Sequence, residues 1–187
     1  VTLCYRKNSF MKKFITITMV LALSLAACEQ VDELTQFEMD YTTSFTIPGT
    51  IGMDVPIDLQ TPEIQTNSTE KFSGQDTRED LIEEIVLREM NLSIESPSGG
   101  DFSFLNGLTI FLNAEGMEEV KVAWKDSIPE DPGSTLQLET ASADLKEYIF
   151  KDQFQLRVQS QTDEIIDQDH EVQVESVFHV DAEILGQ

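Results

Sequence analysis

Residues 37–47, Phe-Glu-Met-Asp-Tyr-Thr-Thr-Ser-Phe-Thr-Ile, alternate along their whole length. Every second residue is apolar, aromatic or β-branched, and in an extended chain these residues share one face: Phe37, Met39, Tyr41, Thr43, Phe45 and Ile47. Strict alternation of this kind is typical of a strand with one face in a core. Pro48 and Gly49 then end the segment. The stretch therefore predicts a half-buried β-strand.

The same pattern recurs along the chain and predicts further short strands at residues 51–59, 86–95, 108–114, 119–124, 136–140, 154–158 and 170–184. Pro56 places the second strand at a sheet edge or a bulge, because proline lacks the N–H that a central strand donates. In the last strand the apolar register slips near Ser176 and Val177, which predicts a bulge there. Short helices are expected over 76–84 and 144–151, and a loop over 61–75. About seven to nine strands separated by turns favour one antiparallel β-sandwich, immunoglobulin-like or related, over residues 36–187.

Composition narrows the function classes. The chain has 187 residues, 12 of them Lys or Arg and 35 Asp or Glu, for a net charge of −23. Apolar residues make up 40% of it, which is enough for a packed core. A protein this acidic lacks the cations needed to neutralise phosphates. We therefore expect no nucleic-acid partner.

The region before residue 29 has the form of a secretory signal. Met11-Lys12-Lys13 is a short cationic start, an apolar run follows from residue 14 to 25, and the run ends in Leu25-Ala26-Ala27-Cys28. The 14 residues from 14 to 27 are too few for a spanning helix, which needs ~20. Residues 1–10 do not fit a signal peptide, and we interpret them as a start-site artefact before Met11.

Leu25-Ala26-Ala27-Cys28 resembles the lipobox of bacterial lipoproteins. The resemblance implies that the Cys28 thiol receives a diacylglycerol and that signal peptidase II cuts before it. It also implies anchoring in the cell envelope, with the outer membrane as the expected site. Two or three acyl chains anchor a protein stably where one does not. The alternative is an ordinary signal peptide with a cysteine near its end.

In the processed chain, residues 28–35 would form a short acidic tether. Removal of residues 1–27 takes four of the 12 basic residues and no acidic one, so the net charge falls from −23 to −27. Anionic headgroups would repel such a domain, so lipid rather than electrostatics must hold it at the membrane.

Few residues suit catalysis. The histidines at positions 170 and 179 lie nine apart in one predicted strand, and an odd separation puts them on opposite faces. No Gly-x-Ser-x-Gly motif is present. We therefore expect no catalytic residue, although two carboxylates across a cleft would suffice for a glycan-cleaving enzyme.

Calcium is the one metal for which the sequence contains clusters of suitable donor side chains. Asp163, Asp167 and Asp169 bring carboxylates together in a predicted turn, and residues 126–131 contain a second acidic group. Calcium sites use such oxygens, but neither segment follows the Asp-x-Asp-x-Asp-Gly pattern. The alternative is a plain acidic turn.

Trp124 is the single tryptophan, and it lies at the end of a predicted strand. An exposed indole there could stack on a sugar, whereas tryptophan in a strand more commonly belongs to the core. The triplet Asp126-Ser127-Ile128, just beyond it, resembles an O-glycosylation site of bacterial envelope proteins.

Together these features predict a lipid-anchored, non-enzymatic binding or assembly module whose partner is an envelope protein or a glycan. It would need no cofactor besides the lipid. The alternatives are an envelope enzyme that acts on glycans through paired carboxylates and a calcium-stabilised adhesin. A binding module requires an exposed apolar or aromatic patch on a sheet face, whereas an enzyme requires a concave pocket with perturbed acids.

Overall fold

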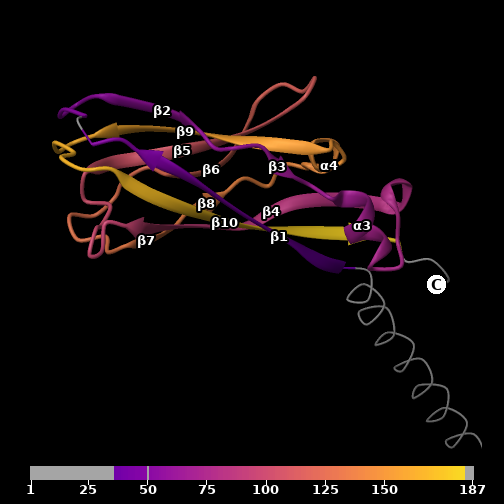
Figure 1. Ribbon diagram of the computed structural model, residues 1–187. Coiled ribbons are helices and arrows are strands. Elements are labelled where there is room, and N and C mark those ends of the chain that lie inside the picture. The colour runs from indigo at the N-terminus through magenta and orange to yellow at the C-terminus, as the bar shows by residue number, and fades with distance from the viewer. Residues whose placement is uncertain (1–35, 50, 184–187) are drawn as a thin grey trace, which may run out of the picture. The chain divides into compact units, whose positions relative to one another are not determined.

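The computed structural model describes residues 36–49 and 51–183, which form an antiparallel β-sandwich (Figure 1). One sheet has four strands in the order β1 (Gln36–Ile47), β10 (His170–Ala182), β4 (Ile82–Ser96) and β7 (Thr135–Gln137). The other has six: β2 (Pro56–Gln60), β9 (Gln153–Thr162), β5 (Leu105–Ala114), β6 (Val120–Lys125) and β8 (Glu139–Thr140) in order, with β3 (Ile64–Gln65) also paired to β9. The predicted fold class is confirmed. The expected artefact, signal peptide, Cys28 and tether all lie outside the described residues.

Side chains from both sheets meet in one hydrophobic core. Its centre holds three aromatic rings packed edge to face: Tyr41 lies 5.3 Å from Phe154 and 5.6 Å from Phe178, centroid to centroid. The Tyr41 hydroxyl donates a hydrogen bond of 2.8 Å to the carbonyl of Thr66. Burial raises the pKa of this phenol, because the ionised form would lose its hydration. The first strand is thus tied to the core by packing and by a satisfied polar group.

The prediction of a helix over residues 76–84 is wrong. Only a 3-10 turn, η1 (Glu79–Leu81), forms there, and β4 starts at Ile82. In its pairing with β10, β4 has one extra residue at Glu83 and another at Arg88. Each bulge shifts the inward face by one position. The buried residues therefore acquire helix-like spacing while the backbone is extended: Ile82, Ile85, Leu87, Met90 and Leu92.

The irregularity expected near Ser176 is present, but the partner strand contains the extra residue. The register between β10 and β4 shifts between Val177 and Phe178, where it skips Arg88. Inward and outward positions in β10 itself alternate without interruption, and Ser176 is buried. Its hydroxyl donates to the Tyr41 carbonyl at 3.3 Å, which satisfies the buried group.

The loop expected over 61–75 contains β3 and the short helix α3 (Ser68–Ser73), so that expectation is wrong too. Phe72 is buried, with its ring 6.3 Å from Phe37 and 6.1 Å from Phe150. Tertiary packing of Phe72, which local sequence does not reveal, therefore stabilises the helix. The helix expected over 144–151 is confirmed as α4 (Lys146–Ile149). In the described part of the chain, no helix is long and apolar enough to cross a membrane.

Two strand predictions need adjustment. The strand expected over 136–140 divides into β7 and β8, which belong to different sheets, and the buried Leu138 lies where the chain crosses between them. The strand expected over 51–59 begins only at Pro56, after a turn with Asp54 at a φ of 58°. β2 is at an edge of its sheet, as Pro56 predicted.

Candidate functional site on the outer face of the six-stranded sheet

The outward side of β9 is chemically unusual for so acidic a chain. Its inward residues are apolar at Phe154, Leu156 and Val158 and carry hydroxyls at Ser160 and Thr162. Its outward residues are four glutamines and one arginine: Gln153, Gln155, Arg157, Gln159 and Gln161. The outward positions of β10 in the other sheet include Glu171, Glu175 and Asp181. We call the outer side of β2, β9, β5 and β6 the glutamine face. The sequence-based prediction does not include this row of amides, because it relies on the apolar residues that alternate with them in β9.

Antiparallel pairing arranges the outward side chains in rows across this face. Arg157 is opposite Phe111 of β5, and Phe111 is in turn opposite Lys121 of β6. The next row places Gln159 opposite Thr109, and Thr109 opposite Trp124. Residues from three strands thus meet in two adjacent rows, because side chains directly opposite each other lie within contact distance.

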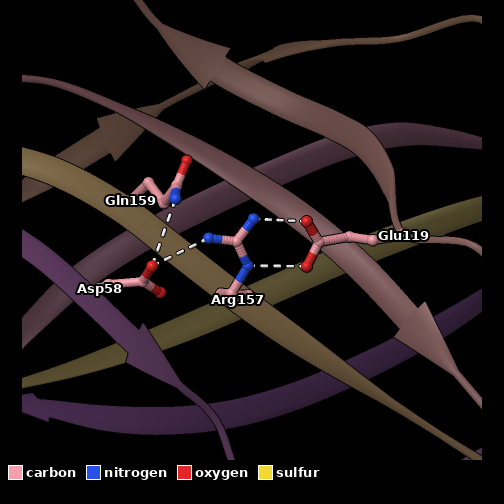
Figure 2. A network of polar contacts seen from close by, with 4 residues as sticks. All are labelled: Asp58, Glu119, Arg157 and Gln159. Carbon is pink, nitrogen blue, oxygen red and sulfur yellow. Dashed lines mark hydrogen bonds and ion pairs between the residues drawn. The ribbon is translucent and has the colours of Figure 1, made fainter.

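Arg157 is fixed at the centre of the face (Figure 2). Its Nε donates to Glu119 at 2.7 Å, its Nη2 donates to the other oxygen of the same carboxylate, and its Nη1 donates to Asp58 at 3.0 Å. Gln159 donates to the same Asp58 oxygen at 3.2 Å. The hydrogen bonds that Glu119 accepts from Arg157 lower the pKa of Glu119, and the same bonds raise the pKa of Arg157. The two carboxylates hold the arginine in one orientation.

Trp124 and Phe111 lie outside the core. The other ten aromatic residues of the described chain are buried or pack against the core, whereas these two are half-buried on the glutamine face. The expectation that Trp124 belongs to the core is therefore wrong. A cation covers part of each ring: Lys121 Nζ is 4.2 Å from the Trp124 centroid, and the Arg157 guanidinium carbon is 4.6 Å from that of Phe111.

A hollow of about 280 Å³ opens beside these rows, lined in part by Gly107, Thr109, Gln159 and Gln161. The missing side chain at Gly107 allows a close approach of strands, because a Cβ there would lie 2.7 Å from the Lys125 carbonyl oxygen. A second hollow of about 370 Å³, with Gln153 and Asn113 among its lining residues, lies toward the other end of β9. The face thus has a depression at each end of its glutamine row.

The structure does not bring the expected calcium ligands together. Asp169 accepts a hydrogen bond of 2.7 Å from the Gly49 amide, and Asp167 is exposed. One Asp163 oxygen is buried and has no hydrogen-bond partner among the residues that the structure describes. Over residues 36–49 and 51–183, no group of three or more His, Cys, Asp or Glu side chains is placed to hold a metal ion. The acidic residues of 126–131 form no such group either.

The two histidines lie on opposite faces of β10, as predicted. His170 points inward, and its ring centroid is 4.6 Å from that of Phe104. His179 is on the outward side and is half-buried. Neither Nδ1 has a hydrogen-bond partner within the described residues. Among the residues described, neither imidazole is hydrogen-bonded to a serine, threonine or cysteine side chain.

No protein-family profile matches this chain, and neither does any curated protein sequence. Solved structures similar to it include a chain from the infectious bursal disease virus Gt strain, at 9% identity and a TM-score of 0.35. That match covers 76% of this chain, which spans about a third (31%) of the viral one. A turnip yellow mosaic virus chain matches at 6% identity and a TM-score of 0.27, and the match covers 81% of this chain and 98% of the viral one. A structure of carbohydrate-binding modules from the β-sandwich superfamily matches at 15% identity and a TM-score of 0.26. That match covers 79% of this chain and 55% of the other.

Proposed function

We propose that this protein is a lipid-anchored binding module of the bacterial cell envelope, most simply of the outer membrane, and that its ligand lies on the glutamine face. A diacylglycerol on Cys28 would hold the domain at the membrane through the tether of residues 28–35. The binding itself would be non-enzymatic. The partner would be an envelope protein or a glycan.

One observation carries the proposal: Trp124 and Phe111 are the aromatic residues of the described chain that the core does not use, and they occupy adjacent rows on one sheet face. Aromatic side chains supply large contact areas with little conformational entropy to lose, which suits recognition. Around them, fixed Arg157 and the amides of β9 supply polar contacts in a preformed arrangement. A preformed surface loses less entropy on binding.

The ion pairs on this face favour binding over glycan hydrolysis. Hydrolysis through paired carboxylates needs one acid with a raised pKa, so that it is protonated when it meets the leaving group. Asp58 and Glu119 both accept hydrogen bonds from Arg157, and this interaction lowers the pKa of Glu119. Glu119 is therefore suited to holding an arginine rather than to donating a proton. The calcium-stabilised adhesin makes a separate prediction: a chelator would lower the melting temperature of that protein.

The anchor is tested by labelling cells that express the full chain with radioactive palmitate. We expect label on the wild-type protein and none on Cys28→Ala. Cys4→Ala is the matched control, because Cys4 is the other of the two cysteines in the sequence and lies outside the lipobox-like segment. Equal labelling of wild type and Cys28→Ala would refute the anchor.

The face is tested by passing envelope extract over the purified, immobilised full-length protein. We expect a component that wild type retains and that Trp124→Ala and Gln159→Ala do not. Gln173→Ala is the matched control, since Gln173 is a half-exposed glutamine on the outward side of β10 and also bonds to a carboxylate, that of Glu175. Identical retention by all four proteins would show that the glutamine face is not the binding surface.

A further inference from the structure

Trp124 provides an apolar platform that a ligand can reach. Its ring is half-buried on the outer face, and the cation above it, Lys121, forms no ion pair within the described residues. A cation–π contact at an exposed site is worth only ~0.5–1 kcal/mol, so a ligand can displace the lysine. The ring C–H groups of a sugar form a flat apolar surface that matches an indole face.

The amides next to this platform match hydroxyl groups. An amide side chain both donates and accepts hydrogen bonds, as a hydroxyl does, whereas a carboxylate only accepts and an ammonium only donates. Gln161 forms no side-chain hydrogen bond within the described residues, and Gln159 uses only its amide nitrogen, toward Asp58. Both line the hollow together with the Thr109 side chain, whose strand partner is Trp124. A ligand dense in hydroxyls would find donors and acceptors beside the indole.

Charge and shape narrow the ligand further. The net charge of −23 repels anionic polymers, and the Arg157 guanidinium already bonds to Glu119 and Asp58. The outward row of β9 from Gln153 to Gln161 extends ~27 Å at the usual rise per residue, with a hollow toward each end. A linear uncharged ligand fits this strip better than a single small molecule.

We infer that the glutamine face binds an uncharged polysaccharide chain, with one sugar ring stacked on Trp124 and a neighbouring ring in the hollow beside Gly107. The inference rests on the proposed function and specifies its ligand. In this arrangement Phe111 supports Arg157, whose guanidinium lies over the Phe111 ring. The ligand would then contact the guanidinium and not the ring.

Trp124 is the single tryptophan of the chain, so its fluorescence reports on this position alone. The purified full-length protein is titrated with the uncharged polysaccharides laminarin, mannan and xylan and with anionic polygalacturonate. We expect a saturable change in tryptophan emission with at least one uncharged polymer and none with polygalacturonate. Retardation in gels that contain the polymer measures the affinity of variants without the fluorophore.

In those gels we expect Trp124→Ala to weaken binding at least tenfold and Gln161→Ala several-fold, with Gln173→Ala unchanged. Circular dichroism and thermal melting establish that each variant is folded. Should Trp124→Ala fail to fold, the affinities of Gln161→Ala and Thr109→Ala test the binding site instead, because neither side chain is part of the core.

Absence of binding to every uncharged polymer, or binding that Gln161→Ala leaves unchanged, would overturn the inference. So would equal binding of polygalacturonate. If the envelope-extract experiment still shows a Trp124-dependent component in that case, the proposed function stands and only the ligand class is wrong. If that experiment fails too, both proposals fall.

Discussion

The guanidinium carbon of Arg157 lies 4.6 Å from the centre of the Phe111 ring, across the pairing of β9 with β5. The same guanidinium bonds to Asp58 on β2 and to Glu119, which directly precedes β6. One side chain thus joins β9 to β2, to β5 and to the residue that leads into β6. Planar stacking and bidentate pairing are properties of arginine that lysine lacks. The centre of the glutamine face is therefore a rigid element of the sheet.

Arg157→Lys should lower the melting temperature by a few degrees although it keeps the charge. Lysine has neither the fork of donors that fits Glu119 nor the flat surface that stacks on Phe111. Arg88→Lys is the control, since Arg88 forms an exposed ion pair with Glu38 through one of its nitrogens. Thermal unfolding followed by circular dichroism measures both variants. Equal shifts in the two would show that the Arg157 network adds no rigidity.

Glu119 should stabilise the protein in a pH-dependent way. Its pKa is lowered by folding, so its contribution is present above the ordinary glutamate value of 4.5 and is lost as the pH falls through the folded value. Glu119→Gln should therefore melt below wild type at neutral pH, and the gap should close in acid. Glu171→Gln, an exposed acid of β10, corrects for the loss of one negative charge. A gap that is independent of pH would contradict the assignment.

Two phenylalanines on neighbouring strands should respond differently to truncation. Phe154 is 1% exposed and touches both other members of the aromatic cluster, so Phe154→Ala should cost about 3–5 kcal/mol. Phe111→Ala, on the opposite face of the same sheet, should cost less than about 1 kcal/mol. Urea unfolding measures both. A larger loss at Phe111 would mean that its face is buried rather than available.

Gly107→Ala should destabilise the protein by about 1–3 kcal/mol, because the new Cβ would lie 2.7 and 2.8 Å from the carbonyl oxygens of Lys125 and Asp126, which are backbone atoms. It should also weaken polysaccharide binding by partly filling the hollow. Gly52→Ala is the control, since its nearest neighbour, a Val55 methyl group, is 3.7 Å away. Urea unfolding and gel retardation report the two effects. Unchanged binding by a folded Gly107→Ala would place the ligand elsewhere.

Local patterning determined much of the architecture. Alternation along residues 37–47 specified β1 and the face that it buries, and Pro56 specified an edge strand. These predictions succeeded because an uninterrupted period of two encodes both extension and orientation. The start of β4 at Ile82, inside the stretch where a helix is expected, does not follow from such a pattern. Bulges at Glu83 and Arg88 change the period, and a bulge exists only relative to the partner strand.

By itself the sequence determined the sandwich class, most of the strands, the opposite faces of the two histidines and the acidic character of the chain. Only the tertiary structure decided that α3 forms around Phe72, that Leu136 and Glu139 enter different sheets, and which half of β9 faces solvent beside Trp124. The outward glutamines were visible in the sequence, but their significance depends on Thr109 and Trp124 from two other strands. A binding face is a property of strands paired across long stretches of chain, and a period of two along one strand does not say which strands will be its neighbours.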